Sequence, residues 1–485
     1  MDLDELPDVT VVLLLLGHAA IAVLLLLDAL APPKLRTLTL RVAAGAGIVL
    51  SLGLAIAGRG SPEWRGFILD ADRSLVAGTA SACAWLLVGA RARLLPRVER
   101  GALVGAGASG LALLAAGRWL VPSLLFALVV GAAAVVLLLE GRRRSYAWFG
   151  VAAGLAIATA AFTVWWLDAE LWELPLAVEG WEKWLVVAAA GLLAGGLPLT
   201  GAWAQGAARG SEAAPLLVGA GFLLLLRPAA GEQPWVAASL VVLATAAYAW
   251  CAVKERKIGT VTACPILVAL AVSFVAPSMV PAIAVASLLA TTVLLLMPAA
   301  RPTAPVLLFT HLPLTAGFGA VVVAGEVAFR RAVDAGEVID AVPWSVVVVV
   351  LPAMVGASLL LARRLILRGA GGPIHSDARV ATWLIAGASL ALALFPEALL
   401  IGDGLPSREI LLFGGASLLG LLTAVIVRRR AGSDVSVPLP DEPLASPPAG
   451  PRFARTVAAA AALFSLIAVA GAAYLLVEGL KLGFL

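Results

Sequence analysis

Two histidines stand inside long apolar segments, where an ionisable side chain is rare and usually functional. His18 lies within the first apolar segment, and His311 lies beside Pro313 in a later one. An imidazole titrates near neutral pH, so both histidines are candidates for handling protons. The alternative for His18 is a structural role. The alternative for His311 is a hydrogen bond that satisfies an interrupted helix.

His311 belongs to a polar interruption that occurs twice. The residues Leu-Pro-Leu-Thr are found at 197–200 and again at 312–315. A proline removes a backbone donor and crowds the carbonyl one turn earlier, and carbonyls freed at membrane depth must contact protein, ions or water. Coincidence in a leucine-rich chain is the alternative. The proton-pathway candidates are His311, Thr310, Thr315, Thr200 and His18, and the expected helix breaks are at Pro198, Pro313, Gly195 and Gly317.

The composition places these residues in a membrane protein. Of 485 residues, 62% are hydrophobic and 13% are charged, whereas soluble domains carry about 25% charged residues. Disordered, collagenous and secreted disulfide-rich classes are excluded. Apolar windows of about 20 residues predict an all-α polytopic membrane protein of about sixteen transmembrane helices. The expected spans are 9–30, 40–57, 74–94, 101–117, 120–139, 147–167, 184–204, 214–226, 235–253, 258–275, 278–297, 304–329, 344–365, 380–400, 409–427 and 455–480.

The distribution of basic residues predicts the orientation. Sixteen alternating spans place 24 of the 34 lysines and arginines on one side, and the basic side of a membrane protein faces the cytoplasm. We therefore expect a multi-pass protein of the cytoplasmic membrane with both termini on the outer side. The first span follows an acidic head, so we interpret it as a retained helix and not as a signal peptide.

Metal and nucleotide chemistry is not indicated. The three cysteines, Cys83, Cys251 and Cys264, lie in apolar runs without CxxC spacing, and the chain has three histidines in total. Zinc, iron-sulfur and covalent haem sites are therefore not expected, nor is any cofactor of the chain's own. No dinucleotide or P-loop motif is present, and the placement of the basic residues indicates topology and not nucleic-acid binding.

The two Leu-Pro-Leu-Thr segments also indicate an internal repeat. They lie five expected helices apart, so they enter the membrane in opposite directions, as in two inverted five-helix repeats with one broken helix each (helices 4–8 and 9–13). The expected organisation is residues 1–100 for helices 1–3, 101–230 and 231–366 for the two repeats, 367–430 for helices 14–15, 431–454 for a proline-rich cytoplasmic linker, and 455–485 for a last helix.

Several ordered passages resemble the antiporter-like membrane subunits of respiratory complex I (L, M and N types), membrane-bound hydrogenases and multisubunit cation/proton antiporters. Phe67 to Asp70, followed by Ser74 and Leu75, is similar to the aspartate-bearing start of the family's helix 3. Pro198, Leu199 and Trp203 resemble the end of helix 7. Residues 253–258 resemble the basic connection between helices 9 and 10, and 312–318 resemble the proline-glycine segment of helix 12.

The resemblance implies proton movement along buried ionisable residues, driven by redox chemistry in other subunits. The ionisable residues typical of the family are missing at the matching positions of this sequence. The family has a Glu in helix 5, a Lys in helix 7, a Lys or His in helix 8 and a Lys or Glu in helix 12. Here helix 5 has Glu140 at its inner edge, 186–197 carry no charge, helix 8 has Arg227 at its outer edge, and the helix 12 position falls near Val321.

We therefore expect an antiporter-like subunit of a redox-driven proton-translocating complex or a multisubunit cation/proton antiporter, with an altered or closed channel. Its partners would be other membrane subunits and lipid, with quinone contacted only through partner subunits and no nucleic acid. The alternatives are a scaffold subunit that does not pump and a stand-alone secondary transporter. A membrane glycosyltransferase using Asp70 and Asp72, or the acidic loop 168–182, as acid/base groups or metal ligands is disfavoured, because the sequence offers no substantial outer domain to build a pocket.

Overall fold

The computed structural model describes a defined part of the chain. It covers residues 10–24 except 15, 19 and 22; 33–91 except 62, 65 and 66; 112, 115–117 and 130; 182–194; 214–226; 233–253; 258–296; 315–368; and 376–394. The expected spans at 147–167, 409–427 and 455–480 and the proline-rich linker lie outside these residues. The described elements belong to two compact units.

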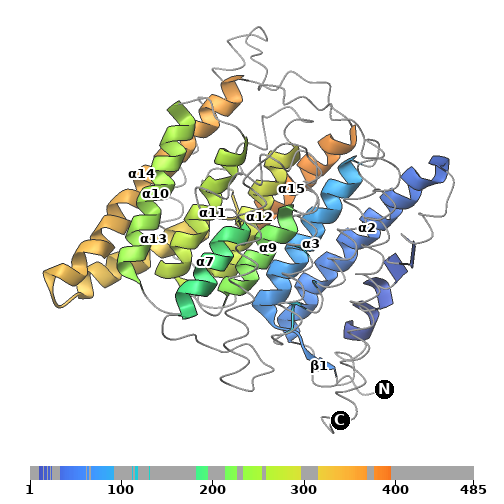
Figure 1. Ribbon diagram of the computed structural model, residues 1–485, viewed down its shortest axis with the longest axis horizontal. Coiled ribbons are helices and arrows are strands. Elements are labelled where there is room, and N and C mark those ends of the chain that lie inside the picture. Colours follow the sequence, from blue (N-terminus) through green and yellow to red (C-terminus); the bar gives the residue numbers. More distant parts are fainter. Residues whose placement is uncertain are drawn as a thin grey trace. The chain divides into compact units, whose positions relative to one another are not determined.

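The first unit contains the described elements up to residue 226 (Figure 1). Helical residues within 10–24 precede α2, which begins at Pro33, a favoured first position because its missing N–H has no partner in a helix. The elements of this unit are α2 (Pro33–Ala57), the 3-10 turn η2 (Gly58–Gly60), β1 (Glu63–Trp64), β2 (Phe67–Ile68), α3 (Ala71–Arg91), α7 (Glu182–Ala194) and α9 (Ala214–Leu225).

A small hairpin lies between α2 and α3 in an otherwise helical set of described elements. Glu63 pairs with Ile68 and Trp64 with Phe67 in an antiparallel arrangement. Ser61, which has φ 45° and ψ 49°, ends η2 in the left-handed region. The hairpin links the two helices where the charged residues Arg59, Glu63 and Arg65 interrupt the apolar pattern.

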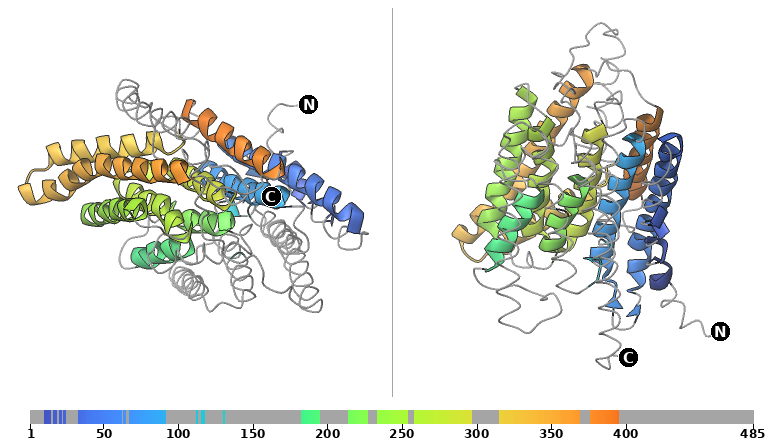
Figure 2. Two further views of the ribbon diagram at one scale, coloured as in Figure 1. Left: turned by 90° about the horizontal axis from the view of Figure 1, so that it is seen from above. Right: turned by 45° about the vertical axis from the view of Figure 1, so that its right-hand side comes forward.

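The α2 and α3 helices pack closely through small residues (Figures 1 and 2). A Cβ atom added to Gly47 would lie 2.5 Å from the Trp85 ring, and one added to Gly78 would lie 2.5 Å from the Ser51 carbonyl oxygen. Ser51 Oγ donates a hydrogen bond to the Gly47 carbonyl oxygen at 2.6 Å and lies 2.8 Å from Ser81 Oγ. Glycine and serine at a helix interface allow such close approach in membranes.

The second unit is entirely helical in its described part. Its elements are α10 (Pro234–Val253), α11 (Ile258–Val275), the 3-10 turn η5 (Pro277–Met279), α12 (Val280–Leu296), α13 (Phe318–Asp334), α14 (Val338–Arg368) and α15 (Ser376–Leu394). The α10 helix packs against α14 and α11, and α14 also packs against α13. The side chains at 264–276 and 279–293 are all buried, so α11 and α12 form the core of this unit.

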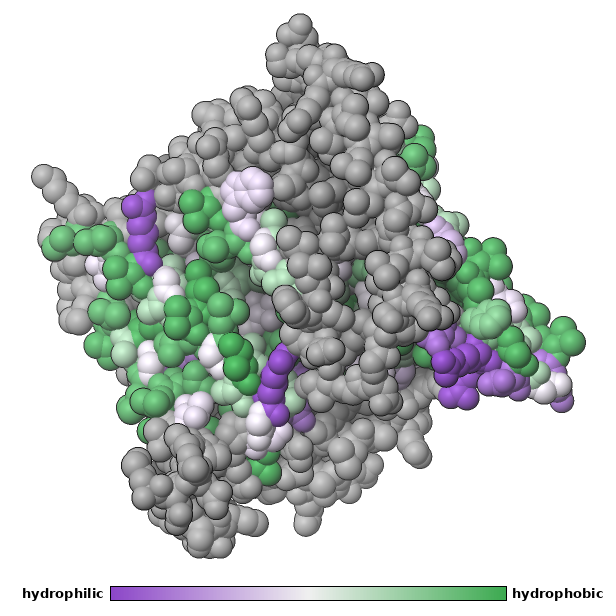
Figure 3. All heavy atoms as spheres, turned by 180° about the vertical axis from the view of Figure 1, so that it is seen from behind, coloured by the Kyte–Doolittle hydropathy of each residue, from purple (hydrophilic) through white to green (hydrophobic). Residues whose placement is uncertain are grey.

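Four described helices are long and apolar enough to cross a membrane: Leu38–Gly60, Ala71–Ala90, Pro234–Val253 and Val338–Ala362. Large hydrophobic side chains, among them Val49 on α2 and Trp235 on α10, remain exposed. Hydrophobic residues cover most of the described surface in Figure 3. These features agree with a multi-pass membrane protein whose outer surface contacts lipid or other membrane helices.

The α13 and α14 helices both extend beyond their expected limits. The α13 helix ends at Asp334 instead of 329, and α14 begins at Val338 instead of 344 and reaches Arg368. A hydropathy window predicts the end of a span at the first charged residues, but here the charged residues are part of the helix, which continues beyond them. Glu326 and Arg330 form an ion pair at helical spacing on the surface of α13, and such pairs support a helix.

Candidate functional site

The start of α13 is the described part of the expected break in helix 12. Gly317 is the N-cap residue of α13, and Thr315 is buried just before it. The N–H groups of the first turn of a helix lack partners within the helix. Two bonds support this start: the Phe318 N–H donates to the Thr315 carbonyl oxygen at 3.2 Å, and the Val321 N–H donates to that of Gly317 at 3.2 Å.

A serine from a distant helix completes this helix start. The Ala316 N–H donates a hydrogen bond to Ser389 Oγ on α15, with 3.2 Å between nitrogen and oxygen. Ser389 is 1% exposed, so the bond is shielded from solvent. Ser389 could not be predicted from the sequence, because a single serine in an apolar span carries no signal of a partner 73 residues away.

The other candidates near the two expected breaks lie outside the described residues. These are His311, Thr310, Pro313, Thr200, Pro198 and Gly195. Their roles, and the inverted repeat that they indicate, stay predictions. Of the predicted set, the structure describes Thr315, Gly317 and His18.

His18 is buried in the N-terminal helical segment of the first unit. Its Nδ1 lies 2.8 Å from the Leu14 carbonyl oxygen. A carbonyl oxygen only accepts, so Nδ1 carries the proton in this bond and Nε2 of the neutral ring is an acceptor. Nε2 is buried without a hydrogen-bond partner. His18 and Thr315 belong to different units.

Arg73, in the first turn of α3, is a buried charged residue that was not among the predicted site residues. Among the residues whose burial is described, Arg73 is the only charged one that is buried, with 1% exposed. Its Nε donates to the carbonyl oxygens of Ala115 and Gly117 at 3.0 Å each, and Nη1 donates to that of Leu223 at 3.1 Å. The guanidinium therefore joins α3 to two other chain segments through their backbone carbonyls.

Asp70 positions Arg73 from the end of the same helix. Its Oδ1 accepts hydrogen bonds from the N–H groups of Asp72 at 3.1 Å and Arg73 at 3.2 Å, so Asp70 is the N-cap of α3. The Asp70 N–H donates to the Ala116 carbonyl oxygen at 3.0 Å. The carbonyls of three successive residues, 115–117, thus all bond to the start of α3. A structural cap explains an aspartate at this position, which the family resemblance had singled out.

One sequence signal points to Arg73 in retrospect. Ala77, Ala80 and Ala84 follow it at helical spacing, and all three are fully buried. A Cβ atom added to Gly219 of α9 would lie 2.5 Å from Ala80. Arg73 therefore starts the small-residue face by which α3 approaches α9, and a cation on such a face must enter the protein interior.

The polar side chains buried in the described part of the second unit are all uncharged. Its buried polar residues are hydroxyl-bearing: Ser273, Ser287, Thr291, Thr292, Thr315, Ser358, Thr382 and Ser389. Several donate to carbonyls of their own helix, as Thr292 does to Leu288 at 2.7 Å. Ser287 also reaches the carbonyl oxygen of Pro265 on α11 at 3.3 Å. Within the described residues, no group of three His, Cys, Asp or Glu is placed to hold a metal.

Comparison with known proteins identifies the fold. No family model matches the chain. No curated protein matches it either. A chain in the structure of the membrane-bound sulfane sulfur reductase, an archaeal respiratory membrane complex, aligns over 98% of this chain and 95% of its own, with a TM-score of 0.58 and 15% identity.

A second match comes from respiratory complex I of Thermus thermophilus with bound NADH. It covers 84% of this chain and 99% of the other, with a TM-score of 0.59 and 17% identity. The chain has the fold of respiratory-complex membrane subunits. The predicted resemblance to antiporter-like subunits is thus confirmed for the fold. At these identities the matches show the fold alone and leave the chemistry to the residues of this chain.

Proposed function

We propose that this chain is a membrane subunit of a multisubunit redox-driven proton-translocating complex or cation/proton antiporter. The observation that supports it is the near full-length agreement with chains of two respiratory complexes. The antiporter-like fold extends over most of the chain in both matches, so the likeness is not confined to one helical hairpin.

Within such a complex, we propose that the chain's own proton path is altered or closed. Serine and threonine hydroxyls do not change charge near neutral pH, so the hydroxyl-lined described interior of the second unit would not hold a proton in transit. His311, with Thr310, Thr315 and Thr200 nearby in the predicted breaks, would be the group that handles protons if any transfer occurs. The same uncharged interior favours a second candidate, a scaffold subunit that does not pump.

The first experiment is purification of the tagged chain in mild detergent, followed by mass spectrometry of what accompanies it. We expect other integral membrane subunits together with a quinone-reactive, hydrogenase or antiporter module. A chain that purifies alone and transports a solute in liposomes would contradict the subunit proposal and support the stand-alone transporter.

A second experiment separates pump from scaffold once the complex is in hand. His311→Ala is compared with wild type in a proton-flux assay on reconstituted complex, with His375→Ala as the matched control, because His375 lies between two expected spans. Loss of flux only in His311→Ala would support a proton-handling role. Unchanged flux with an intact complex would favour the scaffold.

The orientation of the chain is part of the same proposal. With an even number of spans and the basic loops inside, both termini would face outward. Reporter domains that are active only outside the cytoplasm, fused to each end, would be active at both. Activity at one end alone would show that the number of spans is odd.

A further inference from the structure

The connection between α13 and α14 is a helical hairpin whose tip, residues 329–342, is exposed on all sides. The α13 helix ends at Asp334 and α14 begins at Val338, and no residue from 329 to 342 is buried. Burial begins again on either side of the tip, with Ala328 0% and Trp344 5% exposed. Figures 1 and 2 show the hairpin tip extending past the start of α10, against which α14 packs.

The hairpin tip is apolar and charged at the same time. Phe329, Val333, Val338 and Ile339 are 57%, 66%, 83% and 65% exposed. The charged residues between them are Arg330, Arg331, Asp334, Glu337 and Asp340. So many charges are excluded from the hydrocarbon of a bilayer, and a cluster of large apolar side chains is disfavoured in water. The headgroup layer, where amphipathic helices lie, accommodates both kinds of side chain.

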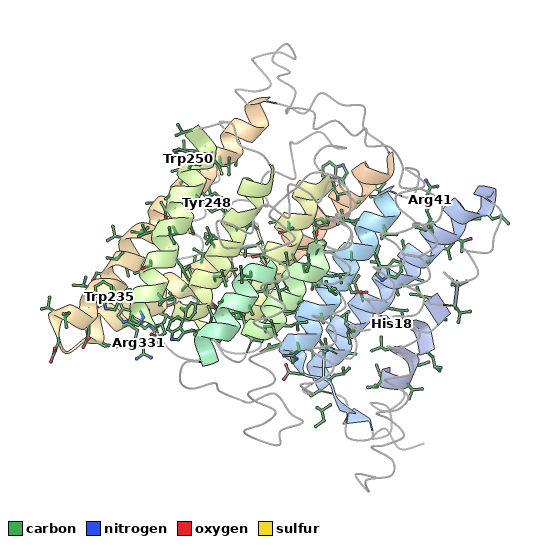
Figure 4. All side chains as sticks on the ribbon, in the orientation of Figure 1. His18, Arg41, Trp235, Tyr248, Trp250 and Arg331 are labelled. Atoms are coloured by element: carbon green, nitrogen blue, oxygen red, sulfur yellow. The ribbon has the colours of Figure 1, made fainter. Side chains whose placement is uncertain are left out.

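The length of α14 places the tip at the same level. The apolar segment Val338–Ala362 has 25 residues, which is about 37 Å at the helical rise, whereas the hydrocarbon core is about 30 Å thick. Tilting or projection of the helix absorbs the excess, and in both cases its first turn lies at the edge of the hydrocarbon. Trp235, 57% exposed at the start of α10, marks such an edge. Figure 4 shows Trp235 and Arg331 toward the same end of the second unit.

We propose that the hairpin tip is an interfacial anchor of the second unit, which binds zwitterionic phospholipids in the headgroup layer. The lipid phosphates pair with the guanidinium groups of the tip, and the lipid ammonium groups pair with its carboxylates. Two cations and three anions leave the tip with a net charge of −1. A headgroup that carries both charges therefore matches the tip, whereas a purely anionic headgroup is repelled by the surplus of acid.

The apolar side chains of the tip complete the match to lipid. Val338 and Ile339 contact the outermost methylene groups of the acyl chains, and the arginines reach outward on their apolar stems. The lipid-facing surface continues from the tip along α14, where Val349 is 71% exposed. Because α14 packs against both α10 and α13, an anchor at its start fixes the depth of this helix group in the bilayer.

The test measures how deep the tip lies in the membrane. A nitroxide is attached to Val338→Cys in the full chain, in nanodiscs of phosphatidylethanolamine and phosphatidylcholine. Power saturation of its electron paramagnetic resonance compares oxygen, which concentrates in hydrocarbon, with a neutral nickel chelate, which stays in water. The control is Val349→Cys, eleven residues further along α14 and about 16 Å deeper. Unmodified chain gives the background, since its three cysteines are buried.

We expect the Val338→Cys label to lie at the phosphate level, between the Val349→Cys label and a nitroxide free in buffer. A label as open to the nickel chelate as the free nitroxide would overturn the proposal, because the tip would then stand in water. A label closed to both oxygen and the chelate, in the chain or in its assembled complex, would also overturn it, because protein would cover the tip.

Two further measurements test the recognition itself. With the label at Val333→Cys, replacing Val338 and Ile339 together by asparagine should move the label toward water, and Val380→Asn should leave its depth unchanged. Val380 is equally suited as a control because it is 58% exposed but lies on α15. Exchanging the zwitterionic lipids for phosphatidylglycerol should also move the label toward water. A depth that is the same in both lipids would contradict the pairing with zwitterionic headgroups.

Discussion

Arg73 Nη1 donates a hydrogen bond to the Leu223 carbonyl oxygen at 3.1 Å and so joins the start of α3 to the last turn of α9. The last carbonyls of a helix have no partner within it, and a cation near that end also interacts favourably with the helix dipole. With its bonds to Ala115 and Gly117, one guanidinium satisfies three backbone acceptors on two segments.

Replacing Arg73 should therefore destabilise the first unit. Arg73→Met leaves buried carbonyls without a donor, which should lower the free energy of unfolding by about 1–3 kcal/mol for each carbonyl. Arg73→Lys should recover only part of this loss, because an ammonium lacks the planar fork that reaches both segments. The measurement is Tm in detergent. The control is Arg330→Met, since Arg330 is 73% exposed and a surface pair contributes only about 0.2–1 kcal/mol. Equal effects of Arg73→Met and Arg330→Met would contradict this account of Arg73.

Gly78→Ala should separate α2 from α3. The added methyl group would lie 2.5 Å from the Ser51 carbonyl oxygen, which is backbone and cannot rotate away, and overpacking of this kind costs about 1–3 kcal/mol. A Cβ atom at Gly45 on α2 meets nothing within 4 Å, so Gly45→Ala should be neutral or stabilising. Thermal unfolding of both variants tests the contact, and a stable Gly78→Ala protein would show that the helices are not packed in this way.

Ser389→Ala should loosen the start of α13. Without the hydroxyl, the buried Ala316 N–H has no acceptor, which should lower the free energy of unfolding by about 1–3 kcal/mol. Hydrogen exchange of the peptide containing residues 315–318 should become faster. Ser345→Ala is the control, because Ser345 is exposed and bonds only to its own helix at Ala341. Unchanged exchange in Ser389→Ala would mean that the bond across 73 residues does not hold this segment.

His18→Leu distinguishes a structural histidine from one that handles protons. Nε2 is buried without a partner, so removing it eliminates an unsatisfied polar atom, and stability should stay equal or rise. If His18 is structural, proton flux in the reconstituted complex should also be unchanged. Reduced flux with unchanged Tm would instead place His18 on a proton path.

Much of the secondary structure could be predicted from local pattern. The expected spans 235–253 and 258–275 correspond to α10 (Pro234–Val253) and α11 (Ile258–Val275). These limits were predictable because charged residues at 254–257 interrupt two apolar runs. The hairpin at 63–68 and the extension of α13 to Asp334 were not, since short strands and surface ion pairs carry little hydropathy signal.

The sequence by itself determined the membrane class, the apolar helices and the resemblance to antiporter-like subunits, because lipid demands apolar runs of a set length. Tertiary structure alone decided which polar groups meet. Arg73 lies 150 positions from Leu223, and Ser389 lies 73 positions from Ala316. Partners of this kind depend on how helices pack, and hydropathy along a chain does not encode that packing.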